Sequence, residues 1–246
     1  MNEVSKLFDV RSKKYSQIYT NLNLKKLLHR EKLQRLKLVE RLILDLSKNT
    51  DDELIIDIGC GTGNLLCSLR DKLPAKMYGF DISKEMIKVA SRQDSKDVIF
   101  KVGTIDDVSK KANIVCSLGV MGYQDDQEIF LQNLSTLIDT EGYLIFTTAN
   151  GNSITRFMRN FLIKFHRTIF RKSNRVEFLS IKEKKVQKVL CSRGFKLIKK
   201  TYITFGLGLF SSSIECKIDR LLFKYINNKF IGKFLSLSVI YLFKRI

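Results

Sequence analysis

Two carboxylates and three closely spaced glycines form the part of this sequence that is best suited to bind a ligand. Asp57 is followed by Gly59, Gly61 and Gly63, and Asp81 lies 24 residues after Asp57. Glycines between a buried strand and a helix let backbone amides approach a ligand closely. The spacing differs from the G-x-G-x-x-G pattern that holds the pyrophosphate of a dinucleotide.

An acidic residue beside the glycine loop favours a ligand with a cationic end over a phosphate. Asp57 suits an ammonium group, and Asp81 ends the next predicted strand, where a carboxylate accepts hydrogen bonds from both hydroxyls of a ribose. S-adenosylmethionine (SAM) has an ammonium group, a ribose and no phosphate. The combination predicts a SAM site, and the alternative is a pair of ordinary carboxylates at strand ends.

Hydrophobic periodicity around the two acids predicts strands that alternate with helices. Residues 54–58 form a buried strand that ends at the glycines, and residues 77–80 form the strand that ends at Asp81. This alternation indicates an α/β fold with a parallel sheet between two helical layers. The further predicted strands are 98–102, 114–118, 143–148, 195–205 and 234–243, and the predicted helices are 22–47, 64–72, 83–92, 126–138, 180–192 and 218–226.

We expect a single core with two helical additions in this chain of 246 residues. Residues 1–48 are predicted to form an N-terminal helical cap, and residues 49–246 the SAM-binding domain. Residues 152–178 interrupt the alternation after the fifth strand, and we expect them to form a helical lid insertion.

The order of these segments resembles that of the class I SAM-dependent methyltransferases. More narrowly, it is similar to the small-molecule group that includes the ubiquinone and menaquinone biosynthesis methyltransferases. The resemblance implies a three-layer, Rossmann-like, seven-stranded sheet whose last strand is antiparallel. It covers most of residues 5–205 and is carried by residues 53–63, 80–86, 103–108, 114–123, 141–145 and 193–195.

The resemblance also implies which residues contact SAM. Family members often have an acid where Thr104 stands, to accept the adenine amino group, so either the Thr104 hydroxyl or Asp106 is expected to take that role. Cys60 is expected to be a small residue in a crowded loop and not a nucleophile. The implied cofactor-binding residues are Asp57, Gly59, Cys60, Gly61, Gly63, Asp81, Ile82, Thr104, Ile105, Leu118 and Tyr15.

The catalytic residues are less marked, because methyl transfer from a sulfonium needs mainly an aligned acceptor, and a base only where an alcohol loses a proton. The candidates are His29 in the predicted cap, His166 in the insertion and Tyr123 after the fourth strand. Each histidine has an alternative role as a surface or packing residue. We expect no metal, since the five cysteines show no metal-ligand spacing and indicate a reducing, cytoplasmic location.

The net charge of +19 is concentrated in the last part of the chain. Residues 152–246 hold 22 Lys and Arg against 4 Asp and Glu, whereas residues 49–151 hold 10 against 16. This distribution indicates an anionic partner, which is a membrane surface, a nucleic acid or an acidic substrate.

The insertion places bulky apolar side chains at spacings of three and four, with cations on the remaining positions. Two interpretations are open. In the first, the helix lies at the membrane interface, so the protein is cytoplasmic and peripheral to the inner face of the membrane. In the second, the helix is a lid packed on the domain, with its basic face in solvent. The apolar residues are Ile154, Phe157, Met158, Phe161, Leu162, Phe165, Ile169 and Phe170, and the cations are Arg156, Arg159, Lys164, Arg167 and Arg171.

Three functions compete at this point. The first is a SAM-dependent methyltransferase that acts on oxygen of a small-molecule or lipid-linked acceptor, with peripheral contact to an anionic membrane. The second is an RNA methyltransferase that holds phosphates with the basic region, although no separate nucleic-acid-binding module is present to support it. The third is a non-catalytic protein of the same fold that binds a partner.

Overall fold

A seven-stranded sheet in the order β3-β2-β1-β4-β5-β7-β6 lies at the centre of the fold. The computed structural model describes residues 3–20, 27–93, 98–170, 179–205, 213–226 and 230–246. Strand β7 is antiparallel to both of its neighbours, and the other pairs are parallel. The strands are β1 (Leu54–Ile58), β2 (Lys76–Asp81), β3 (Val98–Val102), β4 (Ala112–Leu118), β5 (Ile138–Ala149), β6 (Phe195–Phe205) and β7 (Ser236–Arg245).

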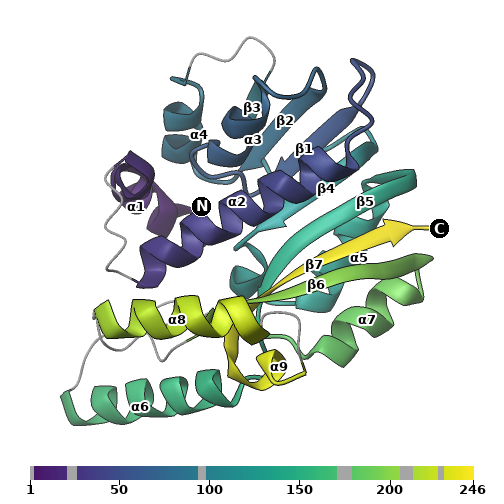
Figure 1. Cartoon of the computed structure of the whole chain (residues 1–246). Helices are drawn as coiled ribbons and strands as arrows, with labels where there is room; N and C mark the ends of the chain where they lie inside the picture. The colour runs from purple at the N-terminus through teal and green to yellow at the C-terminus, as the bar shows by residue number, and fades with distance from the viewer. Residues whose placement is uncertain (1–2, 21–26, 94–97, 171–178, 206–212, 227–229) are drawn as a thin grey trace.

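Helices cover both faces of this sheet and extend beyond one end of it (Figure 1). The helices are α1 (Glu3–Thr20), α2 (Leu27–Leu46), α3 (Asn64–Leu69), α4 (Lys84–Ala90), α5 (Gln127–Thr136), α6 (Ile154–Phe170), α7 (Glu183–Cys191), α8 (Ser213–Ile226) and α9 (Gly232–Leu235), with short 3-10 turns η1 (Ile105–Asp107) and η2 (Met121–Tyr123).

Alternate residues of each strand enter two separate cores, because successive side chains point to opposite faces of a sheet. On one face Ile56 and Val115 pack with the apolar sides of α5 and α7. On the other face Ile55 and Ile114 pack with α2 and α3. The predicted three-layer architecture with an antiparallel last strand is therefore confirmed.

The region before β1 contains two helices where the sequence predicts one over residues 22–47. Helix α2 fills most of that range, and α1 precedes it. Hydrogen bonds of Ser5 and Asp9 with Ile82 and Ser83 hold α1 in place. The division at residue 48 stays a prediction.

A buried ion pair sets the position of α2. The Arg30 guanidinium lies 2.9 Å from the Asp219 carboxylate of α8, and the same carboxylate accepts a hydrogen bond of 2.8 Å from the Phe205 amide at the end of β6. Because the side chain of Asp219 is almost fully buried, these contacts compensate its charge. They direct the residues that follow Arg30 toward the carboxyl ends of the strands.

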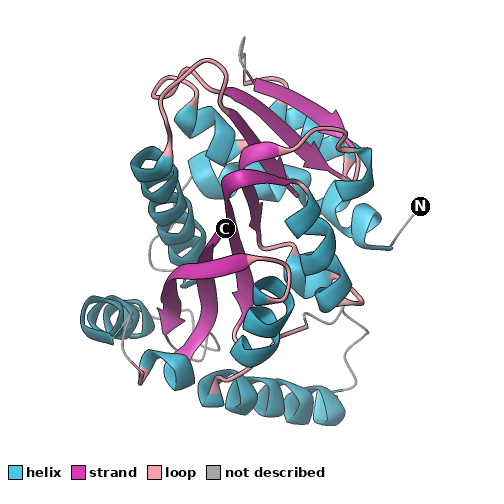
Figure 2. Cartoon of the chain, turned by 90° about the vertical axis from the view of Figure 1, so that its right-hand side faces the viewer, coloured by secondary structure: helices cyan, strands magenta, loops and turns pink. Residues whose placement is uncertain are grey.

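Helix α6 runs along one end of the molecule, near α8 and α9 (Figures 1 and 2). Its outward side carries Phe157 and Phe161, which are 73% and 64% exposed. Its inward side carries Arg156 and Arg159. The lid interpretation, with the apolar face packed and the basic face in solvent, is thus wrong for this turn of the helix. Among the described residues, no helix is long and apolar enough to cross a membrane.

Candidate functional site

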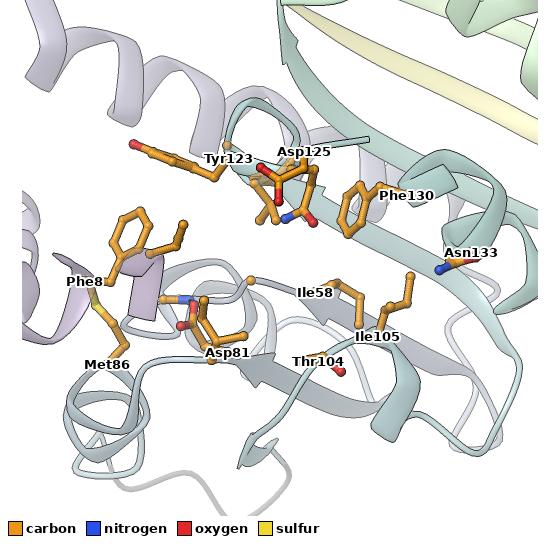
Figure 3. Close-up of a pocket in the computed structure, with 18 of the residues that line it drawn as sticks. Phe8, Ile58, Asp81, Met86, Thr104, Ile105, Tyr123, Asp125, Phe130 and Asn133 are labelled. Atoms are coloured by element: carbon orange, nitrogen blue, oxygen red, sulfur yellow. The ribbon is translucent and has the colours of Figure 1, made fainter. Parts of the chain in front are cut away.

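A cavity of about 650 Å³ opens at the carboxyl ends of β1, β2 and β4. Ligands of open α/β sheets bind at this edge, where loops meet. Figure 3 shows Asp81 and Thr104 on one side of the cavity and Tyr123 and Phe130 on the other. Helices α1, α2 and α6 and the start of β7 complete the wall.

The glycine loop after β1 is held against the end of β2. The Gly59 and Cys60 amides donate to the Phe80 carbonyl over 2.7 and 3.0 Å, and the Gly61 amide donates to Asp81 Oδ2 over 2.8 Å. Gly61 has a φ of +57°, and nothing lies within 4 Å of the position that a Cβ would take. The loop therefore presents bare backbone to the open cavity at this residue.

Asp81 lines the cavity and organises its floor. Its second oxygen, Oδ1, accepts a hydrogen bond of 2.9 Å from the Ser83 amide. Burial raises the pKa of this carboxyl, and the amides of Ser83 and Gly61 oppose that shift. Each oxygen keeps a lone-pair direction for a ligand hydroxyl.

Asp57 lies beneath the loop, is only 3% exposed and does not line the cavity. Its Oδ1 atom has no hydrogen-bond partner among the described residues. Burial, reinforced by the negative charge of Asp81, raises the pKa of Asp57 to about 7, and the positive charge of Arg35 opposes the shift. A buried carboxylate in this state is poorly compensated and favours a cation nearby.

Eight of the implied cofactor-binding residues and catalytic candidates line this cavity, and the others do not line it or have side chains outside the described residues. Gly63 packs inside the fold, where a Cβ would lie 2.6 Å from the Phe100 ring. Cys60 is buried, and burial raises the pKa of its thiol well above the usual range, so it is not a nucleophile at neutral pH. The eight lining residues are Gly59, Gly61, Asp81, Ile82, Thr104, Ile105, Leu118 and Tyr123.

The hydroxyl of Thr104 is already engaged in a capping box at the start of η1. It accepts a hydrogen bond from the Asp106 amide over 3.2 Å and lies 3.2 Å from Asp107 Oδ2. Asp106, in contrast, is exposed and lines the cavity. Of the two alternatives for the adenine amino group, this geometry favours Asp106.

Helix α1 forms part of the cavity wall through Val4 and Phe8. Ser5 Oγ donates to the Ile82 carbonyl over 3.1 Å, and Ser83 Oγ donates to Asp9 Oδ1 over 2.6 Å. Phe8 packs edge-to-face on Tyr123, with ring centroids 5.1 Å apart (Figure 3). Two serines, one acid and one ring thus bind α1 to the loops that carry Asp81 and Tyr123.

The three candidate catalytic residues differ in placement. Tyr123 lines the cavity, and burial raises the pKa of its phenol above the usual value, so it stays protonated at neutral pH. His29 lies on α2 and is absent from the described lining. The side chains of His166 and Tyr15 lie outside the described residues.

The residues of α2 and α6 that line the cavity were not recognised as site residues from the sequence. Arg35 reaches the end of β4, where a Cβ on Gly119 would lie 2.8 Å from its guanidinium. Arg156 and Arg159 were assigned to the basic side of the insertion helix, and Glu31 and Lys32 carried no motif. Their signal is weak because one helical turn of charged residues resembles any solvated face.

Known proteins resemble this chain in sequence and in fold. Residues 28–188 match a family described as a methyltransferase domain. An uncharacterized protein of Methanocaldococcus jannaschii is 24% identical over an alignment 250 residues long, which covers 95% of this chain and 87% of that protein. A ubiquinone biosynthesis O-methyltransferase of Pelagibacter ubique is 28% identical over 101 residues, 39% of this chain and 42% of the relative.

The fold is also similar to a solved structure. Magnesium protoporphyrin IX methyltransferase (ChlM) from Synechocystis PCC 6803, crystallised with bound SAM, gives a TM-score of 0.67 at 16% identity. The similarity covers 100% of this chain and 98% of the other. At this identity the likeness shows a common fold.

Proposed function

This chain belongs to the class I SAM-dependent methyltransferases, and we propose that its cavity holds SAM over the ends of β1 and β2 and the methyl acceptor over the ends of β4 and β5 and the start of β7. Family membership and the intact glycine loop favour an enzyme over a non-catalytic protein of the same fold. The observation that carries the proposal is the joint placement of the Gly61 backbone and Asp81 at one cavity.

The residues at the ends of β1 and β2 fit SAM. Asp57 has a buried oxygen without a partner among the described residues, which the charge of an ammonium group would compensate. Asp81 retains acceptor capacity for the ribose hydroxyls, and the space beside Gly61 leaves room for the ligand. Arg35 supplies a cation for the carboxylate of the donor, and Asp106 an acceptor for the adenine amino group.

For methyl transfer, the main task of the protein is to align the acceptor with the methyl group of SAM. When bound, SAM supplies a sulfonium-activated methyl group, whose bond to sulfur breaks as the acceptor oxygen bonds to the methyl carbon. Tyr123, protonated at neutral pH, serves as a hydrogen-bond donor that orients the acceptor and not as a base. Asp125 and Asp126 both line the cavity, and Asp126 caps α5, so we propose Asp125 as the carboxylate that accepts a proton from an alcohol.

A small or lipid-linked acceptor is supported by the surface next to the cavity. The outward face of α6 exposes Phe157, Met158 and Phe161, and its inward face lines the cavity. Exposed cations on α8, namely Lys217, Arg220 and Lys224, lie at the same end of the molecule. Large exposed apolar side chains beside cations are typical of proteins that bind an anionic membrane interface.

We expect methyl transfer to an acceptor in a lipid extract. The protein would be incubated with methyl-labelled SAM and either a total lipid extract or total RNA, and the label would be followed into each product. Incorporation into the lipid fraction supports the proposal, and incorporation into RNA alone contradicts it. The Asp81→Asn variant is the control for label that is transferred without a functional SAM site.

Flotation with vesicles tests the membrane contact. The double variant Phe157→Asp/Phe161→Asp is expected to lose most of the binding to phosphatidylglycerol vesicles at low salt, because it removes apolar area and adds like charge. The control is Ile246→Asp, which replaces one exposed apolar residue by an acid at a position whose amide bonds to Gly194, away from α6. Failure of the unmodified protein to float at low salt, or equal flotation of both variants, would exclude this surface.

A further inference from the structure

The part of the cavity between α2 and α6 is strongly cationic. Lys32, Arg156 and Arg159 line it, and the Glu31 carboxylate acts on both arginines. The Glu31 carboxylate also accepts a hydrogen bond of 3.1 Å from Ser238 Oγ of β7. Among the described residues of α2 and α6 that line this part, the three cations outnumber the one carboxylate.

Arg156 is fixed in place by the fold. It is 5% exposed, its Nε donates to the Leu237 carbonyl of β7 over 3.2 Å, and its amide donates to Ser153 Oγ over 3.0 Å. Burial and the neighbouring Arg159 lower the pKa of Arg156 to about 10, which still leaves it charged at neutral pH. The Glu31 carboxylate opposes this shift, so the fold holds a charged guanidinium at the cavity wall.

Arg159 lies one turn further along α6 and also lines the cavity. Its Nε atom is buried and has no hydrogen-bond partner among the described residues. Burial lowers the pKa of this guanidinium too. Two adjacent guanidinium groups, one of them with a buried donor that nothing described satisfies, present donors that an oxyanion would accept from.

The sheet order separates this pair from the donor loop. Arg156 contacts β7, the glycine loop follows β1, and β4 and β5 lie between these two strands. The negative charges of Asp57 and Asp81 belong to the β1 and β2 side. An anion between α6 and β7 is therefore on the side that the proposed function assigns to the acceptor.

We propose that Arg156 and Arg159 form an oxyanion subsite that binds a carboxylate or phosphate group of the methyl acceptor, so that the substrate class is an amphipathic acid. This inference rests on the proposed function. The anionic group binds at the inward face of α6. The apolar part of the substrate reaches the cavity from the membrane that Phe157 and Phe161 are proposed to contact.

Calorimetric titration of the protein saturated with S-adenosylhomocysteine (SAH) tests this proposal with three probes. Octanoate carries a carboxylate, octyl phosphate carries a phosphate, and octanamide is a neutral analogue of the first. At least one of the two anions is expected to bind saturably and at least tenfold more tightly than octanamide. Tighter binding of octanoate or of octyl phosphate then identifies the group. No saturable binding of either anion, or equal binding of octanamide, overturns the proposal.

Variants assign the effect to Arg159. Arg159→Gln is expected to weaken binding of the anionic probe about 10- to 100-fold, because a hydrogen bond to a charged group is lost. Arg159→Lys should restore part of it, and Lys188→Gln, which removes the same charge from an exposed site on α7, should change nothing. Unchanged probe binding in Arg159→Gln contradicts the assignment.

SAH binding separates this inference from the proposed function. The Arg159→Gln variant should bind SAH as the unmodified protein does, which also shows that it is folded. If SAH binding falls as far as probe binding, the arginine serves the donor and the oxyanion subsite is wrong. If the unmodified protein does not bind SAH at all, the proposed function fails instead.

Discussion

Replacing Asp81 with asparagine is expected to weaken the binding of SAM and SAH by about 100-fold. The carboxylate accepts backbone hydrogen bonds from Gly61 and Ser83 through its two oxygens, and it faces the cavity. Asparagine has the same shape but a single acceptor oxygen, so its NH₂ group would meet a backbone N–H donor. The variant loses contacts to the ribose and also disturbs the glycine loop.

Calorimetric titration with SAH measures this effect, and thermal unfolding confirms that the variant is folded. Glu85→Gln is the matched control, because Glu85 is an exposed acid at the start of α4 and loses the same charge. An affinity for SAH within about threefold of the unmodified protein would mean that Asp81 is not part of the donor site. If Glu85→Gln weakened SAH binding as much as Asp81→Asn does, the loss would be due to the change in net charge and not to Asp81 itself.

Replacing Asp57 with asparagine is expected to stabilise the free protein at alkaline pH. The pKa of Asp57 is about 7 in the folded protein, against 3.8 for an unperturbed group. Between these values the unfolded chain is ionised and the folded chain is protonated, so stability falls as pH rises from about 4 to about 7. The loss amounts to about 4 kcal/mol by linkage, and the asparagine variant avoids it.

Stability measurements at several pH values test this sign. Urea unfolding at pH 8 should show Asp57→Asn to be more stable than the unmodified protein, and the difference should shrink toward zero near pH 4. A difference that stays constant with pH, or one that grows as pH falls, would contradict the assignment of the raised pKa to Asp57. Asp51→Asn, an exposed acid before β1, is the control and should change neither curve.

The same substitution is expected to impair ligand binding. We propose that the ammonium group of SAM or SAH compensates ionised Asp57, so binding should strengthen as pH rises from 5 to about 7.5 and should release protons below pH 7. Titration of SAH in two buffers with different ionisation enthalpies measures that release. Asp57→Asn should bind SAH more weakly at pH 7.5 and show no linked proton. Asp57 would thus lower the stability of the free protein while supporting its function.

The fold and the placement of the glycine loop beside Asp81 were largely predictable from local pattern. The buried strand 54–58, the glycines and the acid at the end of the next strand lie close together in sequence, and their spacing constrains how they meet. The placement of Thr104 shows the limit: its position follows from the pattern, but its engagement by Asp106 and Asp107 depends on a capping geometry that spacing does not reveal.

Helix α6 marks the boundary between what sequence and tertiary structure decide. The amino-acid sequence by itself determined that residues 154–170 form an amphipathic helix and that a glycine loop follows residues 54–58, since both depend on periodicity and neighbouring residues. Only the tertiary structure decided that Arg156 and Arg159 face the cavity while Phe157 faces outward. A helical stripe has two sides, and which one is buried depends on β7 and α2, whose contacts with α6 join residues far apart in the chain.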